Sequence, residues 1–169
     1  AEIGMRAAMT GHLVLSTLHT NDAVSTPLRL IDMGVPRYMV ALSLQMVVAQ
    51  RLVRVICENC GEAHSPSPAE HEWRKYELAD KVDAYSYKRG RGCSQCNGTG
   101  YTGRTGVYEV LEMTNDLVEA INHEDTGMFV QAARKQMAGQ TLRRDAVRLV
   151  VNGRTSIDEA MRISNQFED

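Results

Sequence analysis

The chain has 169 residues, of which 19 are basic and 21 acidic, for a formal charge of -2. This near balance gives no general electrostatic reason to expect nucleic acid or an anionic membrane as a partner. Its length permits one compact body made of smaller sub-domains. Apolar runs are broken well before the ~20 residues that a transmembrane helix needs, and no cleavable signal pattern opens the chain. We therefore predict a cytoplasmic protein with no transmembrane segment.

The first stretch, AEIGMRAAMTGH, predicts an amphipathic helix over residues 2–9. The helical pattern is present from the first residues, and neither an initiator Met nor an N-cap residue precedes it. We expect the chain to be a piece of a longer protein whose catalysis needs residues further upstream. The run HLVLSTL that follows, His12 to Leu18, is typical of a short strand buried on both faces in a parallel sheet.

Polar residues follow this predicted strand, namely His19, Thr20, Asn21 and Asp22. Ligands of open α/β sheets collect at the carboxyl ends of the strands, so His19 is the first candidate for a functional residue. His12 lies at the opposite end, ~23 Å away along a straight strand, and is expected to support the site rather than contact the same ligand atom. The alternative is that both histidines are structural.

Two helices and a strand are predicted next. Asp22 can cap a helix over residues 23–33, which Gly34 and Pro36 would end. A longer helix is expected over residues 36–52, buried because it is apolar almost all the way round. VRVIC, residues 53–57, then reads as a strand.

All four cysteines lie in two CxxC pairs, Cys57 with Cys60 and Cys93 with Cys96. In a cytosolic chain this spacing favours a metal over disulfides. Two residues between the cysteines let a turn direct both sulfurs at one tetrahedral ion, so the pairs predict a closed, structural zinc site without an open position for water. The alternative is two unrelated turns with buried or redox-active thiols.

The 32 residues between the pairs, 61–92, predict a polar loop and then one short helix over residues 69–78. His64 and His71 lie among Ser, Pro and Glu and are interpreted as solvated loop histidines rather than ligands. After the second pair, TGYTGRTG is expected to turn the chain rather than to bind phosphate, because no Lys-Ser/Thr follows. VYEVLEM, residues 107–113, predicts a strand.

From Asn115 the pattern is helical and predicts a small bundle. The expected segments are residues 115–123, 126–139, 140–153 and 155–164. The last of them carries a capping box, either Thr155-x-x-Asp158 or Ser156-x-x-Glu159. The arginines at 143, 144 and 148 read as a solvated face, with a role in a neighbouring subunit as the alternative.

Two family resemblances follow from these motifs. CSQCNGTG fits the CxxCxGxG repeat of the J-protein chaperone zinc region, but that family has four such repeats and CENCGEAH fits only in part. AEIGMRAAMTGHLVLSTLHTNDA closely resembles the histidine box of the type II secretion and type IV pilus assembly ATPases. AQRLVRVICENC, GCSQCNGTGYTGRTGVYEVL and GQTLRRDAVRLVVNGRTSIDEAMRI resemble, in order, the end of that motor core, its tetracysteine module and its closing helices.

The second resemblance covers nearly the whole chain and implies an α/β fold. The expected parts are the C-terminal part of a RecA-like motor core, a tetracysteine zinc-binding insertion and a C-terminal helical subdomain. Their predicted ranges are residues 1–56, 57–100 and 101–169, the last of which starts with a strand that returns to the core.

The same resemblance implies a hexameric cytoplasmic ATPase, peripheral to the bacterial inner membrane, that docks on a membrane platform protein and uses ATP and Mg²⁺. His19 would look towards the ATP γ-phosphate. No GxxxxGK[ST] motif is present, so we expect the chain alone to be inactive. The candidates for an arginine that reaches a neighbouring subunit are Arg6, Arg51 and Arg104.

The tetracysteine module favours an assembly or secretion motor over a retraction motor, with a slight preference for a pilus system. The alternative function is a zinc-stabilised protein-interaction module without nucleotide chemistry. A phosphate loop upstream in the parent reading frame would distinguish the two.

Overall fold

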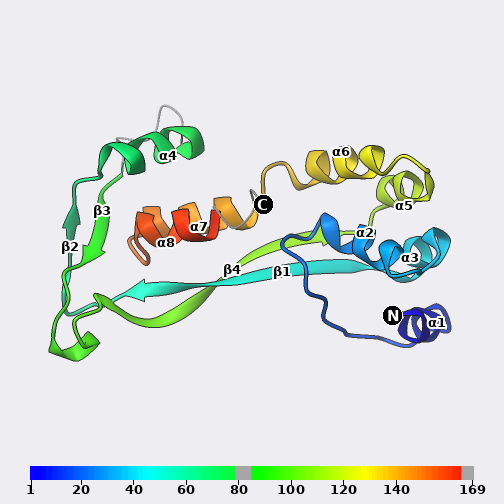
Figure 1. Cartoon of the computed structure of the whole chain (residues 1–169), viewed down its shortest axis with the longest axis horizontal. Helices are drawn as coiled ribbons and strands as arrows, with labels where there is room; N and C mark the ends of the chain where they lie inside the picture. Colours follow the sequence, from blue (N-terminus) through cyan, green and yellow to red (C-terminus); the bar gives the residue numbers. More distant parts are fainter. Residues whose placement is uncertain (79–84, 165–169) are drawn as a thin grey trace. The chain divides into compact units, whose positions relative to one another are not determined.

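The computed structural model describes residues 1–78 and 85–164. The chain divides into two compact units, and the long strands β1 (Met46–Ile56) and β4 (Tyr101–Glu112), which pair with each other, contribute residues to both (Figure 1). Unit 1 consists of Ala1–Ala49 and Glu109–Thr141, and unit 2 of Gln50–Tyr108 and Leu142–Asp169. Among the described residues, no helix combines the length and the apolar character needed to cross a bilayer.

Unit 1 contains five helices together with the first residues of β1 and the last residues of β4 (Figure 1). These are α1 (Glu2–Met9), α2 (Ser25–Asp32), α3 (Arg37–Ser43), α5 (Asn115–Asn122) and α6 (Thr126–Met137). α3 packs against α1, α2 and α5, and α5 packs against α6. Their apolar faces form one buried cluster that includes Leu30, Val40, Leu117, Ile121 and Phe129. The predicted helices over residues 2–9 and 115–139 are thereby confirmed.

The long helix predicted over residues 36–52 is wrong. α3 ends at Ser43, and β1 begins at Met46. The run from Val47 to Val55 is rich in β-branched side chains, which favour strands because they pack well on a pleated surface. On β1 the residues alternate in part between buried and exposed positions. The apolar run therefore has, in its burial, part of the two-residue period of a strand, which its composition did not reveal.

The strand predicted over His12–Leu18 is also wrong. This segment has no regular structure, and Leu13 and Leu15 are 89% and 86% exposed. A strand buried on both faces needs neighbours that satisfy its backbone groups. Within the described residues, the sheets contain only β1 with β4 and β2 with β3, and the His12–Leu18 segment pairs with none of these strands.

Unit 2 contains a pair of short antiparallel strands, three helices and the cysteine-bearing turns. β2 (Gly61–His64) pairs antiparallel with β3 (Tyr87–Gly90), with Gly61 opposite Gly90 and His64 opposite Tyr87. The helices are α4 (Pro68–Leu78), α7 (Leu142–Val151) and α8 (Ile157–Ser164). The sequence predicted these three helices but not the strand pair, whose short strands carry no apolar alternation.

Two predicted helix caps are present in part. The Asp22 Oδ1 atom accepts a hydrogen bond from the Ser25 backbone N–H at 2.6 Å, at the entry to α2. The Ser156 Oγ atom accepts from the Glu159 backbone N–H at 3.3 Å, which selects the Ser156-x-x-Glu159 form of the box at α8. The Glu159 carboxylate points elsewhere, as described below.

Candidate metal centre and histidine segment

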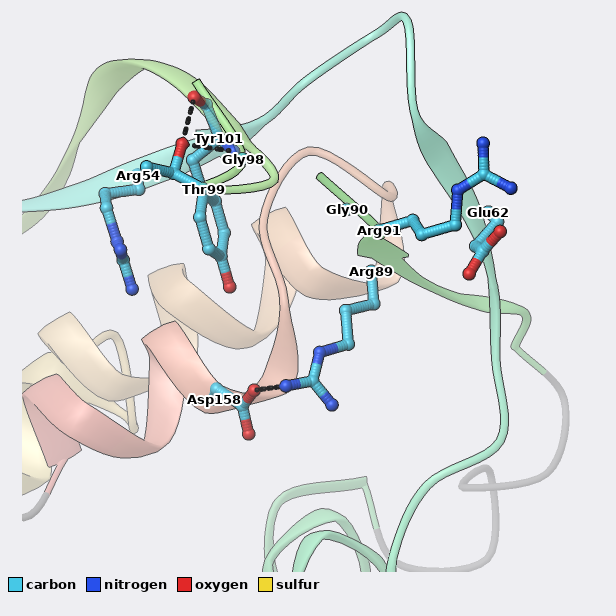
Figure 2. A pocket seen from close by; sticks show the side chains of 9 residues that line it. All are labelled: Arg54, Glu62, Arg89, Gly90, Arg91, Gly98, Thr99, Tyr101 and Asp158. Atoms are coloured by element: carbon cyan, nitrogen blue, oxygen red, sulfur yellow. Dashed lines mark hydrogen bonds and ion pairs between the residues drawn. The ribbon is translucent and has the colours of Figure 1, made fainter. Parts of the chain in front are cut away.

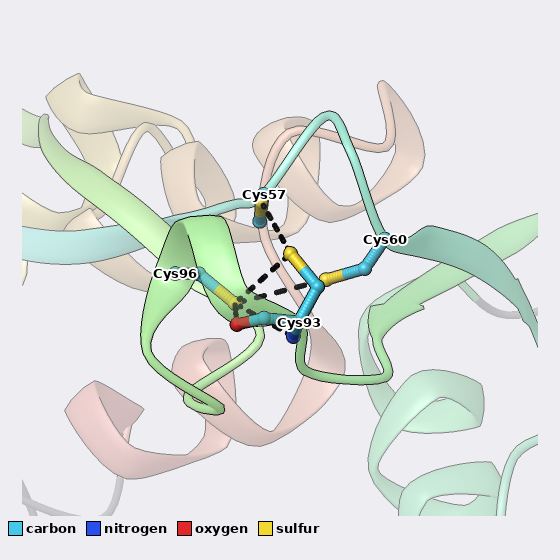
Figure 3. Close-up of side chains that lie close together, drawn as sticks. All are labelled: Cys57, Cys60, Cys93 and Cys96. Atoms are coloured by element: carbon cyan, nitrogen blue, oxygen red, sulfur yellow. Dashed lines mark hydrogen bonds between the residues drawn. The ribbon is translucent and has the colours of Figure 1, made fainter.

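The four cysteines come together in unit 2 from two separate turns (Figure 3). Cys57 follows β1 and Cys60 precedes β2, while Cys93 immediately precedes the 3-10 turn η2 (Ser94–Cys96) and Cys96 is its last residue. All four Sγ atoms lie within 4.8 Å of one another. The sequence-based expectation that the two CxxC pairs converge is therefore confirmed.

The sulfur spacing fits a tetrahedral ion. The Sγ–Sγ distances are 4.0 Å for Cys57 to Cys93, 3.8 Å for Cys60 to Cys96 and 3.7 Å for Cys93 to Cys96. Zinc with Zn–S bonds of ~2.3 Å places tetrahedral sulfurs ~3.8 Å apart. Four cysteines would complete the coordination, so such a centre stabilises structure and has no position for a reacting water.

Hydrogen bonds to sulfur differ between the two turns. The Cys96 Sγ atom accepts hydrogen bonds from the backbone N–H groups of Cys93 and Gly100, each at 3.2 Å. Both bonds lower the pKa of Cys96, and the bond from Cys93 has the larger effect. The Asn59 side-chain amide lowers the pKa of Cys93 to about 6. Burial raises the pKa of Cys60 to about 11. Thiolate, the form that binds metal, is thus favoured at Cys93 and Cys96 and disfavoured at Cys60.

Close backbone contact holds the two turns together. The Cys57 backbone N–H donates to the Gly100 carbonyl oxygen at 2.9 Å, and the Arg91 N–H donates to the Cys60 carbonyl oxygen at 3.0 Å. A methyl group at Gly90 would overlap the Gly100 carbonyl, and one at Gly100 would overlap the Gly90 carbonyl. Glycine at both positions is therefore a steric requirement of this approach.

A polar cavity of about 490 Å³ lies beside the cysteine turns in unit 2 (Figure 2). Arg54, Arg89 and Arg91 line it together with the acidic residues Glu62 and Asp158. Arg89 pairs with Asp158 at 3.5 Å. Arg54 has its guanidinium 4.1 Å from the centroid of the Tyr101 ring, which also lines the cavity. Because acidic and basic groups are mixed, the cavity has no strong preference for an anion.

His64 does not behave as the solvated loop residue that the sequence suggested. Its Nε2 atom lies 3.1 Å from both carboxylate oxygens of Glu70, and both side chains are largely buried. Burial raises the pKa of Glu70, but hydrogen bonds from the Ser67 backbone and from His64 outweigh this effect and lower it. His64 therefore fastens the end of β2 to the start of α4 and is not among the four clustered ligands. His71, in α4, is also outside this cluster.

The two candidate catalytic histidines lie in unit 1, on the segment between α1 and α2. Both are exposed. The His12 Nδ1 atom lies 3.1 Å from Thr10 Oγ1, which fixes His12 near the end of α1. His19 precedes a turn in which the hydroxyls of Thr20 and Thr26 are hydrogen-bonded at 2.7 Å. His19 was expected at the carboxyl end of a strand, but in the structure it precedes a hydrogen-bonded turn.

Besides Glu70, two further acidic residues are buried with partners that the sequence analysis did not predict. Glu109, on β4, accepts a hydrogen bond from the Ala23 backbone N–H. Glu159, on α8, is 1% exposed and receives hydrogen bonds from the Arg54 backbone N–H and guanidinium at 2.8–3.0 Å, with Arg162 at 3.2–3.3 Å. Burial opposes ionisation, but these donors outweigh it and lower the pKa of Glu159 to about 2. The capping motif was the single sequence signal at this position.

Comparison with known protein families identifies the family of this chain. The sequence profile of the family described as "Type II/IV secretion system protein" matches residues 1–162. The chain belongs to this family. The tetracysteine turns of this secretion-system protein lie inside the match, so CNGTG is explained by the secretion family rather than by a J-protein repeat.

Curated members of the secretion family cover almost the whole chain. The type II secretion system ATPase E of Vibrio cholerae is 40% identical over 168 residues, which is 98% of this chain and 32% of that protein. The type IV pilus assembly ATPase PilB of Myxococcus xanthus is 36% identical over 166 residues, 95% of this chain and 28% of that protein. The chain thus spans about a third of the length of the relatives that it matches.

A solved structure confirms the predicted α/β motor-type fold. The pilus retraction motor PilT with bound ADP matches 96% of this chain and 35% of that chain, with a TM-score of 0.59. Its sequence identity is 23%, so the likeness concerns the fold alone.

Proposed function

We propose that this chain is the C-terminal part of a hexameric, cytoplasmic ATPase that drives type IV pilus assembly or type II secretion at the bacterial inner membrane. The observation that carries the proposal is that named secretion and pilus ATPases match 95–98% of the chain at 36–40% identity. ATP and Mg²⁺ belong to the parent protein, since the chain has no phosphate loop.

The surface of unit 1 supports the view that more protein packs there. Large apolar side chains are widely exposed on it, including Ile3, Leu13, Leu15, Tyr38 and Leu42. Exposing large apolar side chains to water is unfavourable, so further protein packed over them would stabilise unit 1. The rest of the motor core is the occupant that we propose for this surface.

His19 is proposed to face the γ-phosphate of ATP in the parent protein, with His12 as a supporting residue. Both side chains are solvent-exposed in this chain, and each has a hydrogen-bonded threonine as a close neighbour in the sequence. In phosphoryl transfer the protein acts mainly by positioning groups and stabilising charge, and an imidazole N–H serves both purposes.

The cysteine cluster is proposed to hold a structural Zn²⁺. When bound, the ion would contribute folding free energy and fix the two turns, while Cys57, Cys60, Cys93 and Cys96 would supply all its ligands. Residues 57–100 would then form the metal-binding part, between a core part over 1–56 and a returning strand with helices over 101–169. The surface between the turns is proposed to dock on the membrane platform protein; residues 79–84 of it lie outside the described residues.

A zinc-stabilised interaction module without nucleotide chemistry is the second candidate, which the closed, water-free geometry of the cysteine cluster favours. The two candidates make different predictions for the parent reading frame. A phosphate loop upstream of the histidine segment supports the motor, and its absence supports the module.

Replacing His19 with alanine in the parent protein should lower kcat for ATP hydrolysis on the order of 10²-fold, the typical effect of removing one donor to developing charge. ADP affinity should change little, because ADP has no γ-phosphate. His123→Ala, an exposed histidine just after α5, is the matched control. Equal rates for the His19 and His123 variants would refute the role of His19, and a parent protein without ATPase activity would refute the motor.

A further inference from the structure

Glu109 interrupts the buried face of β4. On this strand Val107 and Leu111 are completely buried, and Glu109, between them on the same face, is 5% exposed. Burying a carboxyl group is unfavourable unless it is hydrogen-bonded, whereas an apolar side chain would extend the core at no such cost. A polar residue at this position therefore points to a task beyond packing.

One contact of Glu109 indicates such a task. Its Oε1 atom accepts a hydrogen bond at 2.9 Å from the backbone N–H of Ala23, which lies 86 positions earlier and is completely buried. Ala23 belongs to the turn that joins the His19 segment to α2. Glu109 thus fastens the turn to β4, and all the residues concerned lie in unit 1.

Two other bonds of the turn are local. Thr20 Oγ1 is bonded to Thr26 Oγ1 at 2.7 Å, and Asp22 Oδ1 accepts from the Ser25 N–H at 2.6 Å. These bonds set the shape of the turn but cannot set where it lies on the core, because each joins residues at most six positions apart. The bond from Ala23 to Glu109 is long-range and can do so.

We propose that Glu109 is a positioning residue that fixes the location of His19 by holding the Ala23 N–H. The inference rests on the proposed role of His19 at the γ-phosphate. His19 is exposed and lies four residues before Ala23, so its position depends on the turn that follows it. A shift of a positioned group by about 1 Å can lower a reaction rate on the order of 10²-fold.

A double-mutant cycle in the parent ATPase tests the inference. Glu109→Leu should lower kcat on the order of 10- to 100-fold with little change in the KM for ATP. Combined with His19→Ala, it should cause no further loss, because both changes remove the same contribution. Glu112→Leu, at an exposed position of the same strand, is the control and should retain activity. Independent, multiplicative losses would overturn the inference.

Hydrogen exchange in the 169-residue chain tests the contact separately from ATP hydrolysis. Glu109→Leu should accelerate exchange of the Ala23 amide and leave the buried amide of Ala133 in α6 unchanged. If Glu109→Leu does not fold, Glu109→Gln, which keeps a neutral acceptor, should give a smaller acceleration at Ala23. Unchanged Ala23 exchange overturns the inference even where His19→Ala is inactive. An active His19→Ala parent combined with faster Ala23 exchange instead refutes the proposed role of His19.

Discussion

Replacing Cys96 with serine should abolish stoichiometric metal binding and unfold the cysteine-bearing part of unit 2. Cys96 is buried, and its sulfur accepts two backbone N–H groups within the cluster. A structural zinc site typically contributes ~10–16 kcal/mol of apparent binding free energy that is coupled to folding, more than any single contact in this chain could supply. Elemental analysis should fall from about one zinc per chain to none, with a large drop in thermal midpoint.

Ser94→Ala is the matched control for this change, because Ser94 is exposed and lies in the same turn between two of the cysteines. It should retain zinc and nearly the wild-type midpoint. Chelation of the wild-type chain should reproduce the effect of Cys96→Ser. If the wild-type chain contains no stoichiometric zinc and its thermal stability survives chelation, the cluster is not a structural zinc site.

Replacing Glu159 with alanine should lower the free energy of unfolding by about 3 kcal/mol, since removing one partner of a buried ion pair leaves the other uncompensated. The Glu159 carboxylate receives the backbone N–H of Arg54 and the guanidinium groups of Arg54 and Arg162. The Arg54 guanidinium is about half exposed and can be solvated by water, which keeps the loss near the lower limit for buried pairs. Urea unfolding measures this difference.

The same carboxylate predicts a pH dependence. The pKa of Glu159 is lowered from 4.5 to about 2 in the folded chain, so its stabilisation is fully present above about pH 4.5 and is lost as the pH falls towards 2. The difference in unfolding free energy between wild type and Glu159→Gln should therefore shrink over this window. Taking the difference cancels contributions that both proteins share, including any loss of metal in acid.

Asp158→Asn supplies the control, because this neighbouring acid is about half exposed and pairs with Arg89 at the surface. Exposed pairs contribute at most about 1 kcal/mol, so this variant should stay close to wild type at every pH. A gap between wild type and Glu159→Gln that is constant from pH 6 to pH 2 would show that Glu159 does not act through its ionised carboxylate.

The features predicted correctly from the sequence depend on short-range patterns. The cysteine pairs indicated a common metal site because two intervening residues suffice to direct both sulfurs of a pair, and the structure brings the four sulfurs together. The helices from Asn115 onward show apolar residues at every third or fourth position, and each has a buried face.

The features that were missed depend on residues distant in the chain. Glu109 and Glu159 are buried because of partners 86 and 105 positions away, which no local pattern reveals. Residues 46–52 of β1 were mistaken for helix, whereas the strand predicted over 53–57 matches its end, because an apolar run in a buried strand and one in a buried helix look alike over this length. The His12–Leu18 run has strand composition, but strand formation also needs pairing with a neighbouring strand, and this segment pairs with none of the strands in the described residues.

Purified as it stands, the 169-residue chain should show no Mg²⁺-dependent hydrolysis of ATP. His19 and the cysteine cluster are present, but the chain has no phosphate loop to hold the β- and γ-phosphates and the metal ion. The rate of phosphate release from ATP, with Mg²⁺ and with excess chelator, measures this directly. The predicted result is the same background rate in both conditions. A Mg²⁺-dependent rate in a clean preparation would contradict the assignment of nucleotide chemistry to the rest of the parent motor.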